Sequence, residues 1–207
     1  MPITPQQFEE IQRRLSGKGP RKTSESAEAA GIRASAPALP EARIVLGIDP
    51  SLRGTGYGVI RVAKPRHELL AQGTIHCPAR WERSRCLGKI ASDLRDVIST
   101  HHPDVCVAEG LFFAQNLQTA LIMGEARGAA LSVVAMAGLP IFEIAPRKVK
   151  QAMVGFGGAQ KDAVARMVQR MLQLEEIPDP DAADALALAL VYLQGGGQSA
   201  LNPLKRI

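Results

Sequence analysis

The hydrophobic pattern of the chain changes near residue 43. Before that point, large apolar residues are almost absent after Leu15, and residues 16–40 are rich in Ser, Ala, Pro, Gly and charged residues. Such a segment has too little apolar surface to offset the entropy that folding costs. Residues 1–42 are therefore predicted to be a disordered N-terminal extension, with a short helix over 5–15 as its one ordered element.

From residue 43 onward, short β-branched runs alternate with amphipathic stretches, which predicts a domain over 43–194 followed by a flexible tail over 195–207. The predicted strands are 44–48, 57–62, 67–76, 104–109 and 140–144, and the predicted helices are 81–102, 116–137, 146–154, 160–174 and 180–193. Turn-forming residues join the first three strands, so these strands are expected to pair antiparallel. The later alternation of helices and strands predicts an α/β fold in which helices flank one mixed sheet.

Three cysteines, Cys77, Cys86 and Cys106, show no CxxC spacing. An odd number of cysteines without a pairing pattern argues against a disulfide framework or a zinc site and predicts a reducing, cytoplasmic location. The N-terminus lacks the basic and apolar regions of a secretory signal, and no uninterrupted apolar run reaches the roughly 18–20 residues of a membrane span. The formal charge of +5 and the pI near 9.4 suit a polyanionic partner without identifying one.

Carboxylates stand where predicted apolar elements begin or end. Asp49 follows the first strand, Glu109 ends the fourth, and Asp181 and Asp184 lie in the first turns of an apolar helix, three residues apart on nearly the same face. Each acid alone is typical of a turn or a helix cap. Together the four form a hard-oxygen set suited to Mg²⁺ or Mn²⁺, the ions that assist phosphodiester cleavage.

Five segments of the chain resemble the RuvC resolvases, in the order and near the spacing of that family. They are IVLGIDPSLRGTGYGVI, AEGLFFAQN, GEARG, APRKVKQ and DAADALA, which together span about residues 43–194. The first segment alone is also similar to other RNase H-like nucleases and actin-like ATPases, whereas the whole series is specific. The resemblance does not extend to residues 1–42.

The resemblance implies an RNase H-like fold and a homodimeric endodeoxyribonuclease that nicks four-way (Holliday) junctions in recombination and repair. It matches Asp49, Glu109, Asp181 and Asp184 to the catalytic acids, which hold Mg²⁺ or Mn²⁺ with two ions per active site. It leaves open whether a branch-migration complex of the RuvA and RuvB type recruits this protein.

Candidate DNA contacts are assigned in the same way. Lys150 and Lys161 match basic residues near the cleaved strand, although a solvated basic face is the simpler interpretation of the lysines alone. Phe112, rather than its neighbour Phe113, is favoured for stacking on an unpaired base. Arg53 and Arg127 are further candidates for phosphate contact, with surface ion pairing as the default explanation.

Some alternatives stay open. The helix over 116–137 has Ala120, Gly124 and Gly128 at four-residue intervals, which suits packing against a second copy or against the sheet. An RNase H-like nuclease acting on RNA or on another DNA structure has the same four acids. A non-catalytic nucleic-acid-binding module needs only the basic surface. An actin-like ATPase needs a second copy of the fold, for which the chain is too short.

Overall fold

A mixed sheet of six strands is the centre of the fold in the computed structural model, which describes residues 44–110, 116–196 and 205–207. The strands follow the spatial order β3-β2-β1-β4-β5-β6. Their bounds are β1 Ile44–Asp49, β2 Gly54–Arg61, β3 Glu68–His76, β4 Val105–Glu109, β5 Ile141–Ile144 and β6 Lys205–Arg206. β1 to β3 pair antiparallel, β4 and β5 continue parallel to β1, and β6 is antiparallel to β5.

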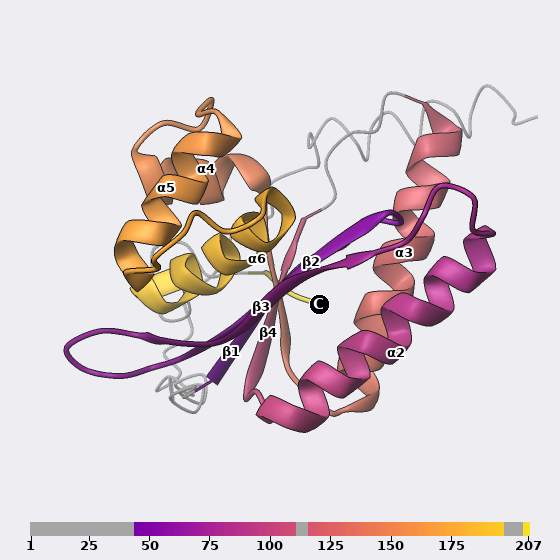
Figure 1. The fold of residues 1–207 in the computed structure, drawn as a ribbon, viewed down its shortest axis with the longest axis horizontal. Coiled ribbons are helices and arrows are strands. Elements are labelled where there is room, and N and C mark those ends of the chain that lie inside the picture. Colours follow the sequence, from indigo (N-terminus) through magenta and orange to yellow (C-terminus); the bar gives the residue numbers. More distant parts are fainter. Residues whose placement is uncertain (1–43, 111–115, 197–204) are drawn as a thin grey trace, which may run out of the picture. The chain divides into compact units, whose positions relative to one another are not determined.

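Helices cover both faces of this sheet (Figure 1). Helices α2 and α3 lie on one face, and α4, α5 and α6 lie on the other. The helix bounds are α2 Arg83–His101, α3 Leu117–Met136, α4 Pro146–Val154, α5 Lys161–Leu172 and α6 Pro180–Val191, after which a π-helical turn, η1, covers Tyr192–Gly196. This arrangement confirms the predicted mixed sheet flanked by helices.

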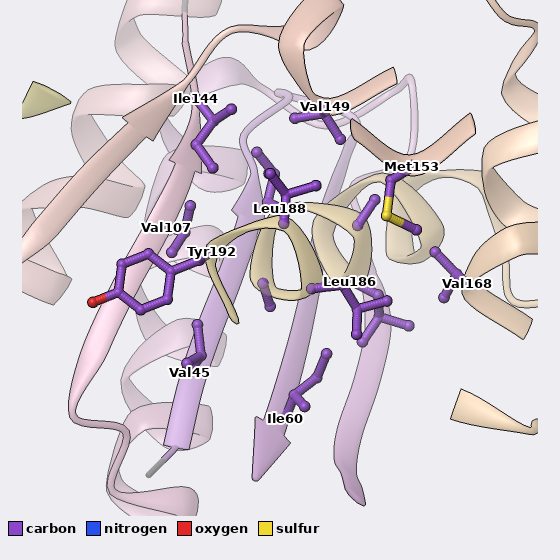
Figure 2. Packing of buried hydrophobic residues seen from close by; sticks show 14 of the residues in the cluster. Val45, Ile60, Val107, Ile144, Val149, Met153, Val168, Leu186, Leu188 and Tyr192 are labelled. Atoms are coloured by element: carbon purple, nitrogen blue, oxygen red, sulfur yellow. The ribbon is translucent and has the colours of Figure 1, made fainter. Parts of the chain in front are cut away.

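Alternation along the strands divides the core into two clusters. In β1, Val45 packs into the cluster on the α6 face, whereas Leu46 and Ile48 pack into the cluster beneath α2 and α3. Figure 2 shows the α6 side, where Leu186 and Leu188 meet side chains from the strands and from α4 and α5. Because successive strand residues point to opposite faces, both faces of β1 are buried, and its position in the sheet is fixed.

Helix α6 packs unusually close to β1 and β2 because glycines face it. A Cβ added at Gly47 would lie 1.9 Å from the Ala185 carbonyl oxygen, and one added at Gly56 would lie 1.9 Å from the Asp181 carbonyl oxygen. Any side chain at these positions would therefore push the helix away. This close approach brings the first turn of α6, with its acids, to the end of β1.

Most of the predicted elements are found with ends shifted by one or two residues, and the largest shift is at the start of β2. β2 begins at Gly54, three residues before the predicted start, because Gly56 already pairs with Asp49 in the register of β1 and β2. The tail predicted over 195–207 is corrected at its end, since Lys205–Arg206 pairs with β5. A strand of two residues is too short to show a periodic pattern in the sequence, and β6 forms only because the edge of β5 is free to pair with it. Residues 1–42 lie outside the described residues.

Helix α3 has an open apolar face. Among the described residues it is the one helix long and apolar enough to span a membrane by length and composition, with a mean hydropathy of 1.3. Of that stretch, 28% is buried inside the fold. Its buried side packs on α2 and β5. Leu117 and Leu121 are exposed on the other side, and side chains at Gly124 and Gly128 would meet nothing within 4 Å. The small residues therefore do not seat α3 on the sheet.

Candidate active site

Two of the predicted acids meet at the ends of neighbouring strands. β1 and β4 run parallel with Ile48 opposite Ala108, so Asp49 and Glu109 extend from the same edge of the sheet. The interaction between their carboxyl groups lowers the pKa of Asp49 and raises that of Glu109. The two carboxyl groups at the strand ends therefore act on each other's ionisation.

Burial makes this pair reluctant to ionise. It raises the pKa of Glu109 from 4.5 to about 8, with the nearby Asp49 charge adding to the effect. Burial, followed by the charge of Asp184, raises the pKa of Asp49 from 3.8 to about 6. Desolvation disfavours the charged form, and neighbouring negative charges disfavour it further. Both acids are therefore harder to ionise than exposed carboxyl groups, and Glu109 more so than Asp49.

The other two acids come from the first turns of α6. Asp184 forms an ion pair with the Lys161 ammonium, with 2.8 Å between Oδ2 and Nζ. Asp181 points toward β2, where a Cβ at Gly54 would lie 2.5 Å from its Oδ2. Neither acid caps the helix, because the N-cap residue is Asp179, and its side chain makes no capping hydrogen bond. Both acids raise the pKa of Asp49, so all four predicted acids share one electrostatic site.

The donor set fits a hard divalent cation, although its side chains are not arranged for one. Within the described residues, no three His, Cys, Asp or Glu side chains form a group that could hold a metal ion as they stand. Glu109 and Asp49 interact with each other, and Asp184 is paired with Lys161. Mg²⁺ and Mn²⁺ prefer carboxylate oxygens as ligands, and four clustered acids supply excess negative charge for them. These acids would hold such a cation in their ionised forms.

The main chain of Glu109 is held by a buried arginine. Arg127 of α3 is only 8% exposed, and its Nη1 donates to the Glu109 carbonyl oxygen. Its Nη2 donates to Glu143 Oε2 on β5 at 3.0 Å. The amide of Gly110 also bonds to the Ile144 carbonyl oxygen at 2.9 Å. The backbone at the end of β4 is thus fixed from the helix and from the neighbouring strand.

The comparisons with known proteins point to one family. The family model for crossover junction endodeoxyribonuclease RuvC matches residues 45–192. The chain belongs to the RuvC family. It is 46% identical to the RuvC of Heliobacterium modesticaldum over 148 residues, which are 71% of this chain and 91% of that relative. It is 44% identical to the RuvC of Chlorobaculum parvum over 154 residues, covering 74% and 82%.

Solved structures extend the RuvC match to three dimensions. Thermus thermophilus RuvC in complex with a Holliday junction substrate is 32% identical, with a TM-score of 0.71 that covers 80% of this chain and 99% of that one. The yeast mitochondrial Holliday junction resolvase Ydc2 is 12% identical, with a TM-score of 0.54 and coverage of 76% and 82%, a likeness of fold alone. The predicted RNase H-like fold is confirmed.

Two arginines of this RuvC protein have structural roles in place of the suggested phosphate contacts. Arg127 is turned inward, as described above. Arg53 donates through Nη1 to the carbonyl oxygens of Pro78 and Trp81 at 2.8 and 3.2 Å, and to Cys86 Sγ at 3.2 Å. It therefore fixes the loop between β3 and α2. Sequence reasoning missed both roles, although a lone arginine in the apolar stretch of α3 was a signal for Arg127.

The residues suggested as DNA contacts differ in their surroundings. Lys161 is exposed and bonded to Asp184, so it belongs to the acid site itself. Lys150 is partly buried on α4, and no described residue forms an ion pair with it. Phe112 and Phe113 lie outside the described residues. All three cysteines are buried and free, as expected from their spacing.

Proposed function

We propose that this RuvC-family protein is a structure-selective endodeoxyribonuclease that resolves four-way DNA junctions by paired, metal-dependent nicks. The observation that carries the proposal is the meeting of Asp49, Glu109, Asp181 and Asp184 at one edge of the sheet. The family, one of metal-dependent nucleases, supports it. The likeness to Thermus thermophilus RuvC with its Holliday junction supports the choice of substrate.

In this proposal the four acids hold Mg²⁺, or Mn²⁺ in its place, with two ions per active site. The ions supply charge neutralisation at the attacked phosphate and activation of water. The protein's residues prepare the site: Glu109 and Asp49 would bind the ions as carboxylates, with any proton given up to solvent, and Arg127 holds the Glu109 backbone in place. Lys161 leaves Asp184 and becomes free to pair with a DNA phosphate.

DNA contacts in this proposal come from Lys150, Lys161 and Phe112. The lysines neutralise phosphates of the cleaved strand, which makes binding depend on salt. Phe112 follows Glu109 by three residues in the sequence and stacks on a base at the crossover. That assignment rests on the sequence alone.

The protein is proposed to act as a homodimer through the open face of α3, because two symmetric nicks need two sites. Its occupant is a second copy of the chain: Leu117, Leu121 and the small positions Ala120, Gly124 and Gly128 allow two such helices to approach closely. Light scattering after size exclusion tests this. Leu121→Glu should give monomers, while Met136→Glu, at an exposed apolar residue in the last turn of the same helix, about 22 Å further along, should remain dimeric. Dimeric Leu121→Glu would contradict the interface.

The deciding experiment is cleavage of a mobile four-way junction by the purified protein, with and without Mg²⁺. Paired symmetric nicks that need Mg²⁺ are the expected result. Preferential cleavage of an RNA–DNA hybrid would support the RNase H-like alternative, and tight binding without cleavage would support the non-catalytic module. We further propose that the protein acts in DNA recombination and repair in the cytoplasm, where the three free thiols stay reduced. A pull-down with RuvA- and RuvB-type proteins tests recruitment.

A further inference from the structure

We propose that a cluster of arginines around Trp81 binds the phosphate backbone of a junction arm, on the opposite side of the acids from Lys150 and Lys161. The cluster, called the arginine patch below, consists of Arg80, Arg83 and Arg85. The choice of a junction arm as the ligand rests on the proposed function. No motif in the resemblance to RuvC resolvases covers these residues.

The arginine patch lies at the edge of the sheet where the acids lie. β3 runs antiparallel to β2, as β1 does, so His76 at the end of β3 is opposite Gly54, close to the end of β1. The next residue, Cys77, donates its amide to the Arg53 carbonyl oxygen at 3.0 Å. Gly54, directly after Arg53, is the residue that lies against Asp181. One turn of chain therefore contacts the patch loop on one side and the acid site on the other.

The two basic regions flank this edge from opposite faces of the sheet. The patch belongs to the loop before α2 and to the first turn of α2, whereas Lys150 and Lys161 belong to α4 and α5 (Figure 1). A four-way junction sends duplex arms in different directions from the crossover. A protein that cuts near the crossover must hold backbone on more than one side, and phosphate contacts are what set that orientation.

The patch is held in shape before any ligand arrives. Arg53 donates to the carbonyl oxygens of Pro78 and Trp81, and the Trp81 amide closes a turn onto Pro78 at 3.0 Å. The Arg85 guanidinium stacks 3.8 Å above the centre of the Trp81 ring. Stacking leaves the N–H edge of a guanidinium available, and that edge matches the geometry of a phosphate.

The surface is also hollowed. A depression of about 470 Å³ is lined by Arg80, Trp81, Glu82 and Arg85. Side chains from four positions thus face one recess rather than spreading over a flat surface. A recess with guanidinium groups at its wall suits a chain of phosphates that lies along it.

The charges of the patch are poorly explained by folding alone. Arg80 and Arg85 form no ion pair with any residue in the described ranges, while Arg83 pairs with Glu125 of α3 at 3.2 Å, with both side chains about half exposed. Glu82 is the one acid in the recess. Cations in the first turn of a helix are opposed by its dipole, and the N-cap residue Glu82 is the one acid at this end of α2, beside three arginines. An external polyanion supplies the missing negative charge.

Binding measurements on the full-length protein test the proposal. Fluorescence anisotropy in EDTA, which prevents cleavage, is recorded with a labelled four-way junction and with a linear duplex from one arm, between 50 and 200 mM salt. Arg80→Ala combined with Arg85→Ala should raise Kd for the junction about tenfold and lower the salt slope by about two, since each lost phosphate contact removes about 0.9. Arg95→Ala is the matched control, an exposed arginine about 15 Å further along the same helix.

Arg80→Ala alone guards against misfolding, because Arg80 has no partner among the described residues and Arg85 still covers Trp81. It should lower the slope by about one. Junction Kd and salt slope equal to wild type in both variants would overturn the proposal and would leave an acidic protein surface as the ligand to seek. If wild-type protein fails to cut junctions while the variants still lose DNA binding, the proposed function fails and the patch stands.

Discussion

The acids of the site form two pairs with contrasting surroundings. Asp49 and Glu109 end neighbouring strands and are mostly buried, and their raised pKa values show that the nearby Lys161 charge offsets burial and like charge only in part. Asp181 and Asp184 extend from the start of a helix, and the exposed Lys161 accompanies Asp184. The strand pair therefore lacks a directly bonded positive charge, whereas in the helix pair the Lys161 ammonium is already bonded to Asp184. The same residue type has been placed in two electrostatic states by the elements that carry it.

The largest expected effect comes from neutralising any one acid of either pair. Asp49→Asn, Glu109→Gln, Asp181→Asn or Asp184→Asn should each reduce junction cleavage at least about a thousandfold, because metal-assisted catalysis contributes several kcal/mol to the transition state. Junction binding should remain close to wild type, since these acids do not contact phosphates through positive charge. Cleavage time courses and anisotropy separate the two outcomes. Near-normal cleavage by the Asp49 or Glu109 variant would remove the strand pair from the mechanism.

A smaller loss is expected when the support of the strand pair is removed. Arg127→Met should slow cleavage by about 10- to 100-fold, the usual cost of losing a residue that orients a ligand. Glu143→Gln is the milder variant, because an amide oxygen still accepts from Arg127. The readout that separates positioning from general destabilisation is the Mg²⁺ concentration for half-maximal rate, which should rise for Arg127→Met. An unchanged Mg²⁺ dependence with a lowered Tm would make Arg127 a purely structural residue.

Metal-free stability should report the strand pair directly. Both folded pKa values are raised, so between about pH 4 and pH 8 the unfolded chain releases protons that the folded chain retains, and stability falls as pH rises. Asp49→Asn removes one charge next to Glu109. It should be more stable than wild type in EDTA at pH 8, by about 1–3 kcal/mol, with a flatter pH profile. Asp181→Asn should gain less, because Asp181 contributes least to the shift of Asp49.

Thermal unfolding in EDTA and across a Mg²⁺ series checks this. At a hundredfold excess over Kd, Mg²⁺ should stabilise wild type by about 2.7 kcal/mol and the amide variants by less. Amide variants that are less stable than wild type in EDTA would show that the acids act as turn formers.

The positions of the acids were predictable because they depend on short patterns. A β-branched run ending in an acid indicates a strand end, and two acids three residues apart in a helix start share a face whatever surrounds them. The glycines that let α6 approach β1 also stand in the sequence, yet their purpose appears only with the helix beside them.

The roles of the arginines depended on distant contacts. Arg127 bonds to Glu109 and Glu143, which are 18 and 16 residues away and reach it only because β4 and β5 are neighbours. Arg53 bonds to a loop 25 to 28 residues further along. Composition predicts a surface arginine in both cases, since most arginines are exposed. Convergence of the acids already predicts a raised pKa for at least one of them, but the largest cause of the shift at Asp49 and Glu109 is burial, which no local pattern gives.

The smallest expected effect separates the helix pair from the strand pair. Lys161→Ala removes the cation beside Asp184, but that lysine is 60% exposed, and exposed ion pairs contribute only about 0.2–1 kcal/mol. Stability in EDTA should therefore change far less than in Asp49→Asn, while the salt slope of junction binding should fall by about one. Lys150→Ala is the companion variant. Because Lys150 is not paired with an acid among the described residues, its loss should lower the slope by the same amount without a change in Mg²⁺ dependence. Wild-type slopes in both variants would return these lysines to a solvated basic face. A large loss of stability in Lys161→Ala would mean that the helix pair, too, depends on permanent compensation, and the contrast between the two pairs would disappear.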